Sequence, residues 1–221
     1  MLVFFLAQNA SALEANITSK TIGVFLKGEY NRGFLHQGSV SAIGSLALNE
    51  QYTLRGGLSL GGSVRDTDIQ AFASAGVAPF TIPLNFTLGY TYNGFPEYNA
   101  HAHAIVPMVS YNSKWIGASL GPSFRFTSFL GEDAHFESVL SGSVHFNFLT
   151  TEIVQLILRF SNVNDFTIRN FGAYSLTLNS IVRLNEQWVL INDLELMQSG
   201  SVGLSANFYG IAWRGGVQFT W

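Results

Sequence analysis

The chain of 221 residues has no cysteine and few charged side chains. The missing cysteine excludes disulfides, thiolate nucleophiles and cysteine-ligated zinc. Charged residues make up 11% of the sequence, against about 25% in an average soluble protein. A soluble protein with so few charges would have difficulty covering its surface with polar groups.

The sequence also lacks an apolar run that would cross a membrane as a helix. Its longest uncharged segment, 69–96, contains Pro79 and Pro83 and many Asn, Thr, Ser and Gln residues. A membrane-spanning helix needs about 20 predominantly apolar residues. The segment therefore predicts no such helix.

A concentration of positive charge is absent as well. The net charge is −3, and the eleven Lys and Arg residues are scattered without a cluster or a stripe. Proteins that bind the phosphate backbone carry a basic patch. We therefore expect no nucleic-acid partner.

What the sequence does contain is alternation. From Gln51 it reads QYTLRGGLSLGGSVRD, in which large apolar residues alternate with small or polar ones. A period of two residues indicates a β-strand. The pattern recurs along the whole chain, which predicts about twelve strands joined by short turns, without a helical crossover. The segment 151–160 is also compatible with a short helix.

The strands are long. The run 52–64 would extend about 40 Å at roughly 3.3 Å per residue, and a tilt of about 45° gives it a vertical reach close to the bilayer hydrocarbon thickness of about 30 Å. In lipid every backbone group must be paired, so the sheet has to close. We predict an all-β, membrane-spanning, antiparallel up-and-down β-barrel of about twelve strands, with about ten or about eight as alternatives. A soluble β-sandwich remains the other interpretation.

Charged residues occur only in connections, in terminal segments or on the small and polar face of a strand. A charge on the Leu and Phe face at mid-bilayer would cost about 2–4 kcal/mol. We therefore expect the apolar face to contact lipid and the polar face to line a lumen with a modest basic excess. The predicted lumen-lining residues are Lys27, Glu29, Arg55, Arg125, Glu137, His145, Arg159, Arg183, Asp193, Glu195 and Arg214.

Both ends of the chain carry recognisable segments. The N-terminal MLVFFLAQNASALEA resembles the end of a secretory signal, with Ala10, Ser11 and Ala12 in the small-x-small pattern and no positively charged region before it. We expect residues 1–12 to be a truncated signal peptide and residues 13–221 to form a single barrel domain. The C-terminal AWRGGVQFTW resembles the assembly signal of bacterial outer-membrane β-barrel proteins. The matching residues are Arg214, Gly216, Phe219 and Trp221, with Trp where that family most often has Phe.

The resemblance implies a Gram-negative-type outer membrane, with both termini in the periplasm. It implies outer-membrane lipid and the barrel assembly machinery as partners. A chain of this strand number looks like the small monomeric barrels that include sugar-acid and nucleoside channels. No motif selects one of those subfamilies.

Catalytic and metal sites are weakly indicated. Ser141, Ser143 and His145 share one face of a strand, but serine is common on all the polar faces and no third orienting group is visible. His101 and His103 lie on one side of a strand, and two ligands do not make a metal site. We expect no catalytic residues, no metal and no cofactor, and we place the histidines other than His36 on lumen faces or at the rim.

The function that these observations favour is a porin-like channel for passive diffusion of small hydrophilic solutes, with a slight preference for anions. A closed structural or surface-interaction barrel is the alternative, in which the lumen charges pair with one another. An outer-membrane lipid-modifying enzyme is a third hypothesis. Short loops argue against a plug made from a long folded-in loop, and the many Gly, Ser and Thr residues on the lumen face favour open space.

Overall fold

The computed structural model describes residues 19–31, 34–48, 51–63, 66–78, 83–130, 132–164, 166, 173–199 and 207–221. The predicted signal segment lies outside these residues. The described strands are β1 (Ser19–Asn31), β2 (Phe34–Ala47), β3 (Tyr52–Gly62), β4 (Thr67–Val77), β5 (Leu84–Phe95), β6 (Ala100–Asn112), β7 (Ile116–Ser128), β8 (His135–Thr150), β9 (Val154–Ser161), β10 (Ala173–Arg183), β11 (Trp188–Ser199) and β12 (Asn207–Thr220). A short 3-10 helix, η1 (Pro96–Tyr98), connects β5 to β6.

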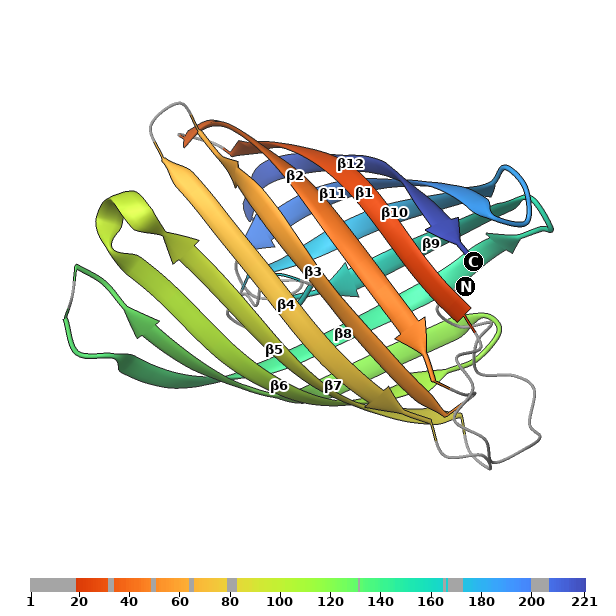
Figure 1. Ribbon diagram of the computed structural model, residues 1–221, viewed down its shortest axis with the longest axis horizontal. Helices are drawn as coiled ribbons and strands as arrows, with labels where there is room; N and C mark the ends of the chain where they lie inside the picture. Colours follow the sequence, from red (N-terminus) through yellow and green to blue (C-terminus); the bar gives the residue numbers. More distant parts are fainter. Residues whose placement is uncertain are drawn as a thin grey trace.

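The strands form a closed antiparallel barrel in which each strand pairs with the next along the chain (Figure 1). Closure comes from β1 and β12, whose register joins Thr21 to Thr220. No helix within the described residues is long and apolar enough to span a membrane. The predicted up-and-down barrel is confirmed, and the helical interpretation of 151–160 is wrong because β9 occupies that segment from Val154 on.

The outer face of the barrel is apolar. Leu26, Leu58 and Leu88 are 57%, 64% and 58% exposed, whereas such side chains are normally buried in water-soluble proteins. A continuous exposed belt of this kind indicates contact with lipid. The soluble-sandwich interpretation is therefore wrong, since a sandwich would turn these side chains into a core between two sheets.

Aromatic side chains gather at the end of the barrel where β1 begins and β12 ends, which we call the termini end. Trp188 packs on Phe219 with ring centroids 4.8 Å apart, and Phe219 stacks on Trp221 at 5.6 Å. Tyr52 and Trp115 are exposed at the same end. Rings at this height suit the aromatic girdle found at a membrane interface.

Two of the turns expected at the opposite end, at 162–165 and 199–201, lie partly outside the described residues. The strands before them end at Ser161 (β9) and Ser199 (β11), and the next described strands begin at Ala173 (β10) and Asn207 (β12). The strand ends carry many small and polar residues, so their alternation gives no clear boundary.

Candidate functional site in the barrel interior

Charged side chains on the inner face form ion pairs along the wall. Lys27 Nζ lies 2.7 Å from Glu29 Oε2, two residues further along β1. Arg125 on β7 pairs with Glu137 on the adjacent β8, and the two residues are directly opposite in the register. These pairs join groups on the same or neighbouring strands. They therefore run along the wall of the barrel.

An ion pair with a buried carboxylate joins Arg214 and Asp193. Arg214 Nε donates to Asp193 Oδ2 at 2.6 Å, and the Asp193 carboxylate also accepts from Asn179 Nδ2. The Arg214 guanidinium lies over the Phe25 ring, 5.2 Å from its centroid. Gly216 makes room for that ring, because a Cβ at this position would come within 2.4 Å of Phe25 Cδ1 and within 2.2 Å of the Val24 carbonyl oxygen. Arg214 and Gly216 therefore have structural roles within the barrel wall, beside the proposed assembly signal.

A segment of the β9–β10 connection reaches across the interior. Phe166 is 8% exposed and contacts Phe72 of β4 edge to face, with ring centroids 5.0 Å apart. Its carbonyl oxygen accepts a hydrogen bond from Asn93 Nδ2 of β5 at 3.0 Å. Strands β6, β7 and β8 lie between β9 and β5 in the barrel order. Phe166 is thus held against a wall distant from the strand that leads to it.

The same segment is fixed along its path. Asn162 donates to the Leu140 carbonyl oxygen at 2.8 Å and accepts from the Gly142 amide at 2.8 Å. Val163 packs against a small apolar cluster of β6 that includes Ala104 and Val106. Our expectation that no connection folds into the barrel is wrong. Nothing in the sequence indicated these contacts, because the segment makes them with strands that are remote from it along the chain.

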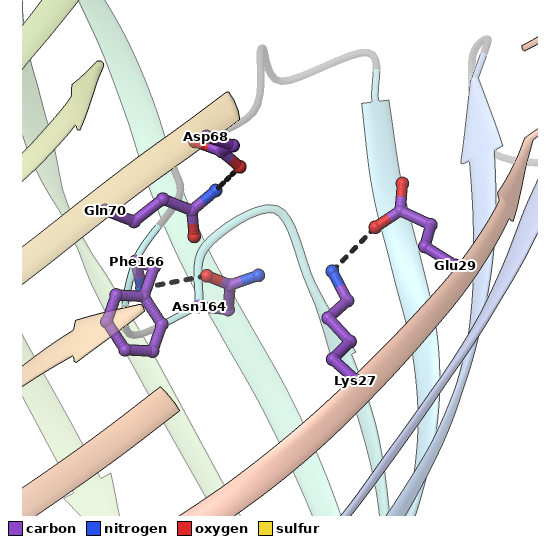
Figure 2. A network of polar contacts seen from close by, with 6 residues as sticks. All are labelled: Lys27, Glu29, Asp68, Gln70, Asn164 and Phe166. Carbon is purple, nitrogen blue, oxygen red and sulfur yellow. Dashed lines mark hydrogen bonds and ion pairs between the residues drawn. The ribbon is translucent and has the colours of Figure 1, made fainter. Parts of the chain in front are cut away.

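Figure 2 shows the polar groups around this segment. Lys27 and Glu29 project from β1, Asp68 and Gln70 project from β4, and Phe166 lies near the β4 residues. Gln70 Nε2 donates to Asp68 Oδ2 at 2.6 Å. Asp68 Oδ1 is buried and accepts no hydrogen bond from the residues that the structure describes.

Asp68 is an inner-face residue that the sequence analysis missed. It is absent from the predicted lining residues, yet it lies within β4, which begins at Thr67. Its place in the register, opposite Gly61 and two residues before Gln70, gives it the inner-face parity. Its carboxylate reduces the basic excess expected of the interior.

The remaining predicted lining residues occupy the same face. Arg159 lies opposite His145 in the β8–β9 register, and Glu195 lies two residues from Asp193 on β11. Arg183 ends β10 near the termini end. Arg55 places its guanidinium 5.7 Å from the centre of the Phe72 ring. The barrel therefore brings Arg55, Phe72 and Phe166 together, whereas Arg183 lies apart from them.

Hydroxyl side chains cover much of the wall between the charges. Ser119 Oγ lies 2.7 Å from Ser143 Oγ across the β7–β8 pair, and Ser123 and Ser141 form a second such pair with no exposed surface. Phe25 and Phe72 are also buried on this face. Some of the small polar residues on the inner face are thus fully buried. Their abundance in the sequence therefore overstates the space left open inside the barrel.

His101 and His103 do not face the interior, which corrects one possibility that we left open. The register places them opposite Gly94 and Tyr92, on the apolar outer face near the opposite end. His103 Nδ1 lies 2.6 Å from the Tyr90 hydroxyl, and its ring is 5.1 Å from that of Tyr92. The shared parity with Ile105 and Val109 was the signal in the sequence.

No catalytic arrangement emerges among the outward-facing residues that the structure describes. Ser128 lies opposite His101 in the register, but its hydroxyl donates to the Glu132 carbonyl oxygen at 3.0 Å. On the inner face, Ser143 pairs with Ser119. No group of three or more His, Cys, Asp or Glu side chains in the described part of the chain is arranged to hold a metal ion.

The rim at the opposite end is tied together by η1. The Tyr98 hydroxyl donates to Asp66, which also accepts from Ser63 Oγ at 3.2 Å. A hydrogen bond from the Thr67 hydroxyl lowers the pKa of Glu97 from its usual value. The β5–β6 connection is thereby fastened to the β3–β4 connection.

These features define a membrane β-barrel of the outer-membrane type with a polar, partly obstructed interior. No protein-family model matches the chain, and no curated protein matches it in sequence. Solved structures do match in fold. The KdgM porin in complex with disordered oligogalacturonate has a TM-score of 0.58 and 11% identity, with 89% of this chain and 98% of that chain covered.

Other matching structures have different functions. The translocator domain of the autotransporter NalP from Neisseria meningitidis has a TM-score of 0.52 and 14% identity, covering 98% of this chain and 91% of that one. The outer membrane phospholipase A from Escherichia coli has a TM-score of 0.51 and 8% identity, covering 90% and 92%. Identities this low establish the fold alone, and one fold can carry several functions.

Proposed function

We propose that this protein is a narrow outer-membrane channel for passive diffusion of small hydrophilic solutes. The observation that carries the proposal is the direction of the inner-face ion pairs. Arg125–Glu137 and Arg214–Asp193 join adjacent strands, and Lys27–Glu29 lies within one strand. Charges paired along the wall line a bore, whereas a closed barrel would be expected to pair them across it.

The fold and the C-terminal residues support the location. An apolar outer belt with an aromatic girdle at the termini end fits an outer membrane, and porins occur among the structures that share the fold. With the resemblance of the last strand to the assembly signal, we place both termini in the periplasm. The opposite end, with η1, then faces the exterior.

The closed barrel remains the second candidate because of Phe166. Its contacts with Phe72 and Asn93 place part of the β9–β10 connection inside the barrel. Barrels of about eight strands are filled by side chains, whereas barrels of 16–18 strands hold open channels. A barrel of this size can therefore be closed by a modest obstruction.

Single-channel recording of the refolded protein in a planar bilayer tests the proposal. We expect discrete conductance steps smaller than those of a wide general porin, because Phe166 and the side chains of the inner face occupy part of the bore. Heat-denatured protein, identified by its altered gel mobility, is the control and should give no steps. Folded protein that inserts into the bilayer and does not conduct would support the closed barrel instead.

A further inference from the structure

The outer face of β10, β11 and β12 carries polar groups within the apolar belt. The register pairs Ser180 with Asn192, and Asn192 with Gly215. The neighbouring row on the same face contains Leu194 opposite Trp213, which is 50% exposed. We call Ser180, Asn192 and Trp213 the outer polar patch.

The patch lies well inside the membrane. Asn192 follows Trp188 of the girdle by four positions along β11 (192 − 188). At roughly 3.3 Å per residue and a tilt of about 45°, this places Asn192 about 9 Å into an apolar band about 25 Å tall. Trp213 is further still from the termini end of β12. It therefore lies away from the interface where Trp side chains usually sit.

The polar atoms of the patch lack partners within the described part of the chain. No hydrogen bond joins the side chains of Ser180, Asn192 or Trp213 to another described group, whereas Asn179 on the inner face of the same region bonds to Asp193. An amide or an indole N–H exposed to hydrocarbon is costly unless it is hydrogen-bonded. Acyl chains offer no such bond. A second polypeptide packed against this face within the bilayer would supply such bonds.

We propose that the outer polar patch is the contact between two copies of this chain. It holds donors, the Trp213 indole N–H and the Asn192 amide N–H, beside acceptors, the Asn192 Oδ1 and the Ser180 hydroxyl. A twofold axis through such a patch sets each donor of one copy against an acceptor of the other. The surrounding leucines would then pack in the apolar rim of the contact.

Gly215 gives the patch its shape. A Cβ at this position would meet Trp213 Cζ2 at 2.4 Å and Asn192 Oδ1 at 3.1 Å. The glycine therefore allows the indole ring and the carboxamide to lie side by side. A large exposed Trp beside a polar group is the kind of residue that dominates binding energy at protein interfaces.

Cysteine crosslinking in membranes tests the contact, since the chain has no native cysteine. Ser180→Cys should form a disulfide-linked dimer on mild oxidation. The matched control is Leu88→Cys on β5, an exposed outer-face position at a similar depth on a distant strand, and it should stay monomeric. Gel mobility before and after heating verifies that both variants are folded.

Sedimentation equilibrium in detergent micelles measures the dissociation constant of the proposed dimer. The double variant Asn192→Leu with Trp213→Phe keeps apolar bulk and removes the polar groups, so the dissociation constant of the dimer should rise at least tenfold. The midpoint of monomer unfolding should be unchanged or higher. Wild-type monomers at every concentration, with no Ser180→Cys dimer, would overturn the proposal. So would a Ser180→Cys crosslink in native membranes to a protein of different mass.

Discussion

The contact between Phe72 and Phe166 offers the sharpest test of the interior. Phe166 is the only described side chain of 165–172, and its ring meets that of Phe72 at an interplanar angle of 88°. We consider the variants Phe72→Ala and Phe166→Ala, singly and together. A double-mutant cycle isolates the contact from the other effects of each substitution.

The expected magnitudes follow from burial and geometry. The two side chains are 7% and 8% exposed, and a Phe→Ala change in a packed core costs about 3–5 kcal/mol. We expect each single substitution to fall near the lower end, about 3 kcal/mol, because polar groups such as Asn93 adjoin the rings. An edge-to-face aromatic pair contributes about 0.5–1.5 kcal/mol beyond buried area. The coupling energy of the cycle should therefore be about 1 kcal/mol.

The assay is urea unfolding in lipid vesicles, followed by the fluorescence of the four tryptophans. Asn93→Ala is a second probe of the same docking, since it removes the hydrogen bond to the Phe166 carbonyl oxygen and should cost about 1 kcal/mol. If Phe166 narrows the bore, Phe166→Ala should also raise the single-channel conductance. Single effects that add within about 0.3–0.5 kcal/mol, the level of independent sites, would refute the contact.

Two further predictions concern selectivity and assembly. In a KCl gradient, Arg125→Gln should shift the reversal potential toward cation selectivity, and Glu137→Gln should shift it toward anion selectivity. Each should lower the free energy of unfolding by about 1 kcal/mol, as expected for a partly exposed pair. The double variant should return close to wild type, and equal shifts of one sign would contradict the pairing. Removal of Trp221, or Phe219→Ala, should reduce outer-membrane levels in cells more than it reduces refolding in detergent, and unchanged levels by immunoblot would show that the last strand is not read as an assembly signal.

The sequence predicted the barrel because both faces of most strands differ strongly in polarity. In β3, Leu58 and Leu60 alternate with Ser59 and Gly61, and the structure exposes the first pair on the outer face. The pattern was weaker in β6, where the small residues Ala102 and Ala104 stand between the two histidines and Ile105. The contrast in size and polarity between neighbouring residues, rather than their intrinsic strand propensity, decided which positions could be assigned to the inner or the outer face.

The interior could not be predicted to the same extent. Phe166 is one of several apolar residues between β9 and β10, and its place depends on Phe72 and Asn93, which are close to it only after the barrel has closed. Asp68 was not predicted to line the interior, because the start of β4 lies among polar residues and could not be located from the alternation. Alternation specifies a face, but it carries no information on what crosses the space that the faces enclose.

The arrangement of the inner charges bears on what the channel would select. Each carboxylate in the Arg125–Glu137 and Arg214–Asp193 pairs sits beside its guanidinium on the wall, so that at a distance the two charges largely cancel. Asp68 adds a further negative charge that offsets part of the basic excess. A passing ion then meets small dipoles along the wall and not a broad field of one sign. We therefore expect the bore and its amide and hydroxyl groups to discriminate mainly by solute size and hydrogen bonding. The anion preference should be slight enough for a single substitution such as Arg125→Gln to reverse it.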